Sequence, residues 1–212
     1  MNTDQLIDML ARDLRAVDPR LERRRLLLAL GVGAAFSLGL TLALFGLQPG
    51  LEGGIPDAAF LVKAAYGATL ASLLFVMAST LVQPGAAMPS WQRLSVPIGG
   101  LAVLAAVELA SSPASQWENL LFGASWSRCP LRIAALSLPF LAALVIVARR
   151  QAPTRLRRTG AVVGAAAGSA AAIIYALACT ETSAVFVLVW YTLGIALATA
   201  IGAAIGPRLL RW

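Results

Sequence analysis

The chain has 212 residues, of which 59% are apolar and 13% are charged, and its formal net charge is +7. A mean hydropathy of +0.79 is too high for a soluble domain of this size. The composition therefore excludes an ordinary soluble protein and indicates one integral membrane domain with a short polar extension.

The first predicted element is a short amphipathic helix in the segment TDQLIDMLARDLRAV, residues 3–17. At 3.6 residues per turn, its apolar side chains fall within an arc of about 100°. Thr3 is a suitable N-cap, and Asp13 projects at the edge of the apolar arc. The predicted binding surface consists of this apolar stripe together with Asp13. Its residues are Leu6, Ile7, Leu10, Asp13, Leu14 and Val17.

This stripe can lie on the lipid surface, on the protein's own cytoplasmic loops, or in a groove of a partner protein. Helices on a membrane surface usually carry basic residues on their polar face, whereas this one carries Asp4, Asp8, Asp13 and Asp18. The expected cytoplasmic loops are short, basic and poor in apolar residues. A partner groove is therefore favoured, with Asp13 fixing the register by pairing with a basic residue of the partner.

Six apolar runs follow, each near or above the roughly 18–20 residues that a helix needs to cross a bilayer. Transmembrane strands would alternate in polarity, which these runs do not. We expect an all-α fold: an integral membrane bundle of six transmembrane helices after a short cytoplasmic amphipathic helix. The expected division is a partner-binding segment 1–25, a membrane domain 26–206 and a cytoplasmic tail 207–212. The expected spans are Leu26–Leu47, Ala58–Val82, Leu94–Ser111, Leu131–Ala148, Gly160–Ala178 and Val185–Ile205.

The basic residues are distributed unevenly along the chain. If the N-terminus is cytoplasmic, fourteen of the seventeen basic residues fall on the cytoplasmic side, and the outer loops carry mainly acidic residues. This is the positive-inside pattern, so topology explains the basicity and direct binding to nucleic acid is not expected. The first apolar run is too long for a removable signal peptide. We expect a multi-pass protein of a bacterial inner membrane with both termini in the cytoplasm.

Small residues recur at every fourth position in three of the spans. Such ladders let helix backbones approach closely within lipid. They can serve packing within one bundle, which their presence in three spans favours, or an interface in a homo-oligomer. The ladders are Gly31, Ala35, Gly39 and Ala43, then Gly160, Gly164 and Gly168, then Gly194, Ala198, Gly202 and Gly206.

The chain has two cysteines, and the expected topology places both at its outer face. Cys129 precedes the fourth span and Cys179 follows the fifth. In an oxidising periplasm the pair can form a disulfide, or as thiolates it can capture a thiophilic metal ion transiently. Because the chain has no histidine, a closed zinc site of the Cys/His kind is excluded, although Glu181 or Glu118 can join two thiolates. The remaining interpretation is two unrelated small residues at helix ends.

Other polar and aromatic residues gather at the same end of the spans. Charged side chains within spans are costly and usually paired, so we expect Glu108 to pair with Lys63 or Arg132, unless these groups snorkel to the headgroups. Together with Glu181, these three residues are the predicted polar support of the cysteines. An interfacial aromatic belt is predicted at Trp117, Trp126, Trp190 and Tyr191.

Motifs of common enzymes are missing from the sequence. It has no Walker loop, no Ser/His/Asp set, no H-E-x-x-H and no C-x-x-C. We therefore expect neither an enzyme nor a resident cofactor. The alternatives are a membrane thiol–disulfide or quinone-linked redox enzyme and a small transporter, the last weakened because no inverted repeat is visible.

An ordered set of five features resembles the NrsF family, the negative regulators of sigma F. These features are TDQLIDMLARDLRAV, the isolated cysteine before span four, the second cysteine in YALACTETS, the following FVLVWY, and the closing RLLRW. The resemblance runs from end to end, although no single motif is strongly specific. It implies a six-span anti-sigma factor of the inner membrane.

The resemblance also implies roles for particular residues. The helix from Leu6 to Val17 would hold an extracytoplasmic-function sigma factor at the membrane. Cys129 and Cys179 would be the sensor residues, and heavy-metal or oxidative stress would release the sigma factor.

Overall fold

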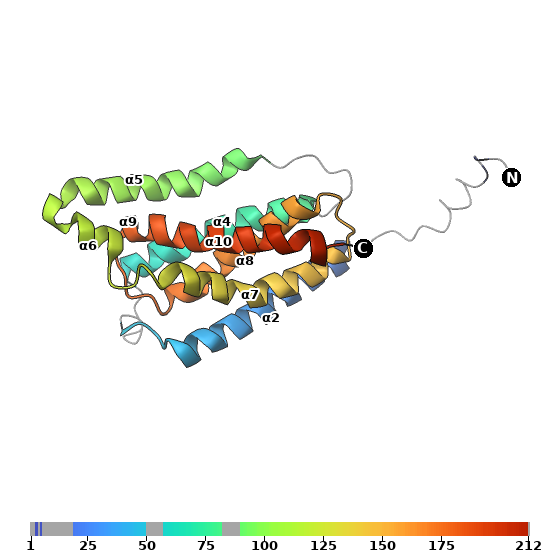
Figure 1. The fold of residues 1–212 in the computed structure, drawn as a ribbon, viewed down its shortest axis with the longest axis horizontal. Coiled ribbons are helices and arrows are strands. Elements are labelled where there is room, and N and C mark those ends of the chain that lie inside the picture. Colours follow the sequence, from blue (N-terminus) through green and yellow to red (C-terminus); the bar gives the residue numbers. More distant parts are fainter. Residues whose placement is uncertain (1–2, 4, 6–18, 50–56, 82–89, 212) are drawn as a thin grey trace.

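A computed structural model describes residues 3, 5, 19–49, 57–81 and 90–211 of the chain. Within these residues every regular element is helical, and six helices are long and apolar enough to cross a membrane (Figure 1). The expected all-α architecture with six spans is therefore confirmed. Four of them are α2 (Pro19–Leu44), α4 (Ala58–Leu81), α7 (Cys129–Arg149) and α8 (Leu156–Ala176). The other two are the continuous runs Trp91–Ser111, which includes α5 (Ser95–Ser111), and Ala184–Leu209.

The shorter elements connect or interrupt these spans. The run Ala184–Leu209 consists of α9 (Ala184–Phe186), a π-helical turn η3 (Val187–Tyr191) and α10 (Thr192–Leu209). Helix α5 is preceded by the 3-10 turn η1 (Trp91–Leu94) and followed by η2 (Ala114–Gln116) and α6 (Trp117–Phe122).

The first span begins earlier than the apolar pattern predicted. Helix α2 starts at Pro19 rather than Leu26, because proline suits the first turn of a helix and arginine is a good helix former. The predicted boundary at residue 25 falls inside this helix. The predicted amphipathic helix, with Leu6, Ile7, Leu10, Asp13, Leu14 and Val17, lies outside the described residues and stays a prediction.

Helix α8 is the central element of the bundle, and it packs against α10, α4, α7 and α2. A Cβ atom at Gly160 would meet the carbonyl oxygen of Gly202, and one at Gly164 would meet the carbonyl oxygen of Ala198. Helices α8 and α10 therefore approach each other backbone to backbone, as small-residue ladders allow. Packing within one chain is confirmed for the ladders of α8 and α10.

The ladder of α2 does not pack within the bundle. A Cβ at Gly31 or Gly39 would have no neighbour within 4 Å, and Ala35 and Ala43 are exposed. Helix α2 instead contacts α7 through a second row of small residues on its other face. That buried row consists of Ala29, Gly33, Ser37 and Thr41. For the first span, the prediction that this ladder serves packing within the bundle is wrong.

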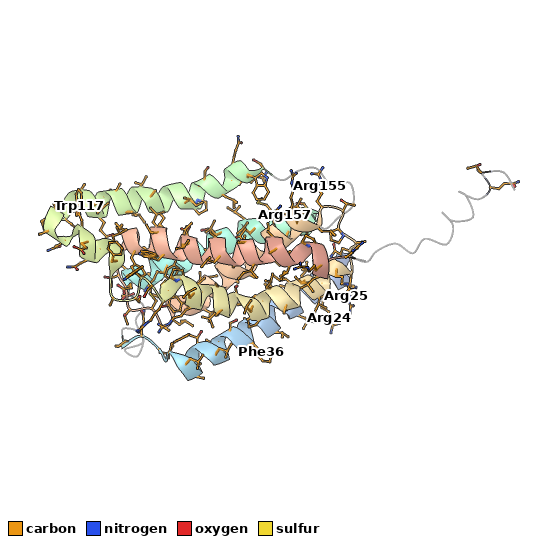
Figure 2. The ribbon with its side chains drawn as sticks, viewed as in Figure 1. Arg24, Arg25, Phe36, Trp117, Arg155 and Arg157 are labelled. Carbon is orange, nitrogen blue, oxygen red and sulfur yellow. The ribbon has the colours of Figure 1, made fainter. Side chains whose placement is uncertain are left out.

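The two ends of the bundle differ in their side chains. Arg24, Arg25, Arg155 and Arg157 gather at the end where the C-terminus lies, and Trp117 lies at the opposite end (Figure 2). The opposite end also carries α6, the start of α7 and the end of α8 (Figure 1). Both cysteines belong to it.

Candidate functional site

The two cysteines lie close together at this end of the bundle. Cys129 is the first residue of α7, and Cys179 lies just after the end of α8. Both thiols are free and almost fully buried, with exposed fractions of 0% and 2%, and they are near enough to interact electrostatically. The prediction that the cysteines share one end of the spans is confirmed.

The two cysteines pack in a buried cluster with two tyrosines and a lysine. We call this cluster the cysteine pocket, and it consists of Cys129, Cys179, Tyr175, Tyr191 and Lys63. Tyr175 of α8 and Tyr191 of η3 are buried, and their ring centroids are 5.9 Å apart. The Tyr191 hydroxyl has no hydrogen-bond partner among the described residues, and it is near enough to both thiols to interact with them electrostatically. Tyr191 is therefore part of the pocket, and its prediction as a member of an interfacial belt is wrong.

Lys63 reaches the cysteine pocket from α4. Its Nζ donates hydrogen bonds to the carbonyl oxygens of Cys179, at 2.6 Å, and of Glu181, at 2.9 Å. A buried ammonium group is costly unless it is hydrogen-bonded, and these two carbonyls satisfy it. The same charge interacts electrostatically with both thiols. Lys63 therefore fastens the segment 179–181 to α4 beside the sulfur atoms.

Glu181 connects the two cysteine-bearing segments. Its Oε1 accepts hydrogen bonds from the backbone N–H groups of Ala124 and Ser125 and from the Ser125 hydroxyl, each at 2.9 Å. A Cβ at Gly123, where φ is +51°, would collide with this carboxylate. The loop after Cys179 is thereby joined to the loop before Cys129.

One oxygen of the Glu181 carboxylate is therefore occupied by these three donors. Among the described residues, no group of three or more His, Cys, Asp or Glu side chains is placed to hold a metal ion. The possibility that Glu181 or Glu118 joins the two thiolates stays a prediction. The donor set fits either a disulfide or a soft cation held by two thiolates, which are the two chemistries predicted from the sequence.

Glu108 binds the start of the last span instead of a basic residue. Its Oε2 accepts hydrogen bonds from the Ser183 hydroxyl, at 3.0 Å, and from the Val185 N–H, at 3.1 Å. Ser183 in turn caps the helix by accepting from the Phe186 N–H. The predicted ion pair of Glu108 with Lys63 or Arg132 is wrong, because the free N–H groups of a helix N-terminus attract the carboxylate.

Arg132 lies at the edge of the pocket. Its guanidinium carbon is 4.4 Å from the centroid of the Phe45 ring, and its Nη1 donates a long hydrogen bond of 3.5 Å to the Tyr175 hydroxyl. The Phe45 ring meets the Tyr175 ring edge-on at 6.3 Å. Arg132 therefore contacts the aromatic wall and makes no bond to the loop after α8.

An outer aromatic cluster covers the helix that follows the cysteine loop. The rings of Trp126 and Trp190 are 5.3 Å apart, and Phe122 contacts both. The indole N–H of Trp190 donates to the Leu121 carbonyl at 2.7 Å. These contacts fix α6 and the following loop against η3.

Sequence reasoning found the cysteines and the charged residues but missed several neighbours. Phe45, Ser125 and Ser183 were not predicted for the site. For Ser183 a signal was present, because a serine before a long apolar run is a common N-cap. For Phe45 and Ser125 no signal existed, since their roles depend on how distant segments meet.

The fold and the site together define a helical membrane protein with a pair of buried thiols at one end of its bundle. The model of the family "NrsF: Negative regulator of sigma F" matches residues 10–212, and the chain belongs to this family. It is 37% identical to the "Probable anti-sigma-F factor NrsF" of Azospira oryzae and 36% identical to the "Anti-sigma-F factor NrsF" of Caulobacter vibrioides. Both matches cover 100% of each chain. No solved structure matches the chain.

Proposed function

We propose that this protein is a membrane-bound anti-sigma factor. It sequesters an extracytoplasmic-function sigma factor through its N-terminal segment and releases it when Cys129 and Cys179 sense heavy-metal or oxidative stress. The observation that carries the proposal is the full-length similarity to two proteins named as anti-sigma-F factors. The pair of free, buried thiols in one pocket supports the sensor role.

The proposed function assigns separate tasks to the two ends of the protein. The apolar stripe from Leu6 to Val17 binds the sigma factor in the cytoplasm. The cysteine pocket lies at the far end of the bundle, on the periplasmic side of a bacterial inner membrane. The protein is then a regulator and not an enzyme, and its partners are the sigma factor and the lipid bilayer.

Charge placed in the apolar stripe should abolish capture of the sigma factor. Burying a leucine side chain contributes about 1.5–3 kcal/mol, so the double variant Leu10→Asp/Leu14→Asp should lose binding while it still inserts into the membrane. Co-purification of the sigma factor with the full-length protein, together with sigma-dependent transcription, measures the effect. Arg12→Gln, on the polar face of the predicted helix, should bind like the wild type.

Continued repression of sigma-dependent transcription in Leu10→Asp/Leu14→Asp would show that this helix is not the contact. The register argument is tested by Asp13→Lys, which should weaken binding, because it reverses the charge at the edge of the stripe.

A topology experiment tests the proposed orientation in the membrane. A reporter that is active only outside the cytoplasm should work when fused after Glu118 or Glu181, and it should be silent when fused after Gln151. This result follows from the positive-inside distribution of the arginines. The opposite pattern would put both cysteines in the reducing cytoplasm and would remove the basis for a periplasmic sensor.

A further inference from the structure

Two arginines lie at the end of the bundle that is otherwise poor in basic residues. Fourteen of the seventeen basic residues belong to the other end or to the N-terminal segment, and Lys63 is bonded to carbonyl oxygens in the cysteine pocket. The remaining two are Arg128 and Arg132, which lie one helical turn apart at the start of α7. Their position runs against the charge bias of the rest of the chain.

Both arginines line one apolar groove between the end of α2 and the start of α7. The groove has a volume of about 320 Å³. Its walls include Leu40 and Leu44 of α2 and Leu131 and Ala135 of α7. Leu44 and Leu131 are about two-thirds exposed, at 67% and 65%, so the groove opens sideways, toward lipid in a membrane.

The charges of this groove are not neutralised by acidic residues of the described part of the chain. Arg132 contacts the Phe45 ring and the Tyr175 hydroxyl, and neither group is anionic. The Arg128 side chain is exposed at the mouth of the groove. The groove therefore combines two guanidinium groups at one end with an apolar channel that runs along two membrane-spanning helices.

We propose that this groove binds an anionic phospholipid, with its phosphate on Arg128 and Arg132 and an acyl chain along α2 and α7. Guanidinium groups bind phosphate oxygens through paired, charge-assisted hydrogen bonds. Each buried methylene of the chain adds favourable transfer free energy. A free phosphate ion matches the arginines but leaves the apolar walls unused, so the lipid fits the whole groove.

The proposed lipid site shares residues with the cysteine pocket, although it does not depend on the proposed function. Arg132 lies over the Phe45 ring, and that ring meets Tyr175. Arg132 also interacts electrostatically with Cys129. A bound phosphate that draws Arg132 outward therefore acts directly on the wall of the pocket.

Native mass spectrometry of the delipidated full-length protein, titrated with phosphatidylglycerol or phosphatidylcholine, tests this site. Phosphatidylglycerol should be retained about tenfold more strongly, as expected for charge-assisted hydrogen bonds. Arg128→Gln should remove most of this preference, and Arg128→Gln/Arg132→Gln should remove it entirely. Arg93→Gln changes an exposed arginine at the other end of the bundle and should keep the wild-type preference.

Two further arms distinguish the lipid from other occupants. Ala135→Phe fills the groove and keeps both guanidinium groups, so it should lower phosphatidylglycerol retention; unchanged retention would overturn the proposal. Equal retention of the two lipids by the wild type would overturn it as well. Displacement of the lipid by millimolar inorganic phosphate would show a plain anion site and contradict the acyl-chain channel. Because the Arg128 side chain makes no hydrogen bond or ion pair with the described residues and is exposed, Arg128→Gln remains informative even if an Arg132 variant unfolds.

Discussion

Replacement of Gly164 by leucine is expected to disrupt the folded bundle. A side chain at this position would push into the carbonyl oxygen of Ala198 and the Cα of Gly202 on α10. Overpacking a core typically costs about 1–3 kcal/mol, and here the obstacle is backbone, which cannot rotate away. Since α8 is the helix on which α10, α4, α7 and α2 pack, loss of this contact should lower the thermal midpoint strongly.

A matched control for this variant exists in the same chain. Gly39 belongs to a ladder with the same four-residue spacing, but a Cβ at Gly39 would have no neighbour within 4 Å. Gly39→Leu should therefore unfold in detergent at nearly the wild-type temperature. If Gly164→Leu unfolds no earlier than Gly39→Leu, the close packing of α8 on α10 is incorrect. If Gly39→Leu instead dissociates a dimer, the exposed ladder of α2 is an interface between copies.

The two ladders of α2 show what a sequence pattern leaves undecided. Gly31, Ala35, Gly39 and Ala43 form one row, and Ala29, Gly33, Ser37 and Thr41 form another, displaced by two residues and so on the opposite side of the helix. Lipid is as apolar as the interior of a bundle, so the hydrophobic pattern cannot tell which row faces inward. In the structure the second row faces the bundle, and its Ser37 hydroxyl donates a hydrogen bond to the Leu136 carbonyl of α7 at 2.8 Å.

The six spans themselves were predictable because length and hydropathy decide them almost alone. The shared end of the cysteines was also predictable, since Cys129 precedes one span and Cys179 follows the next span in the chain. Each span carries the chain to the opposite side of the membrane, so the order of the spans alone places both cysteines on one side, without any knowledge of packing.

The partners of the charged residues were not predictable in this way. Sequence reasoning pairs charges with opposite charges, whereas Lys63 and Glu108 are bonded to backbone and hydroxyl groups of residues 179–185. Which carbonyl or N–H group lies within reach depends on the loop conformation, and the loop leaves no periodic signal. Tyr191 was misplaced for a related reason: it is the last residue of a π-helical turn, and the i→i+5 bonding of such a turn rotates its side chains away from the positions of a regular α-helix.

Cys129→Ser and Cys179→Ser are each expected to leave the sigma factor bound and to block its release. A disulfide forms when the two thiols lose two protons and pass two electrons to an oxidant, and binding of a soft cation displaces the two protons alone. Either event needs both sulfur atoms, so one serine should be as damaging as two. Both cysteines are buried in one pocket, and the bond would tie the start of α7 to the loop after α8.

The change in sigma-factor affinity that release requires is large, and it favours a disulfide or a bis-thiolate bond over a rearranged ion pair. To move the sigma factor from mostly bound to mostly free, the two states must differ by about 5 kcal/mol in partner affinity. An exposed ion pair contributes about 1 kcal/mol or less, whereas a covalent or bis-thiolate bond can supply the difference. A shift of α7 has a route to the N-terminal segment, because α7 packs along α2, and α2 begins at Pro19.

Sigma-dependent transcription with and without cadmium or an oxidant measures the effect in each variant. The wild type should be induced by the stress, and each serine variant should stay repressed while it still co-purifies with the sigma factor. Ala178→Ser is the matched control, because it adds a hydroxyl beside Cys179 and keeps both thiols; it should respond like the wild type. Full induction in either cysteine variant would contradict the switch and leave the cysteines as packing residues of the pocket that Lys63 and Glu181 hold closed.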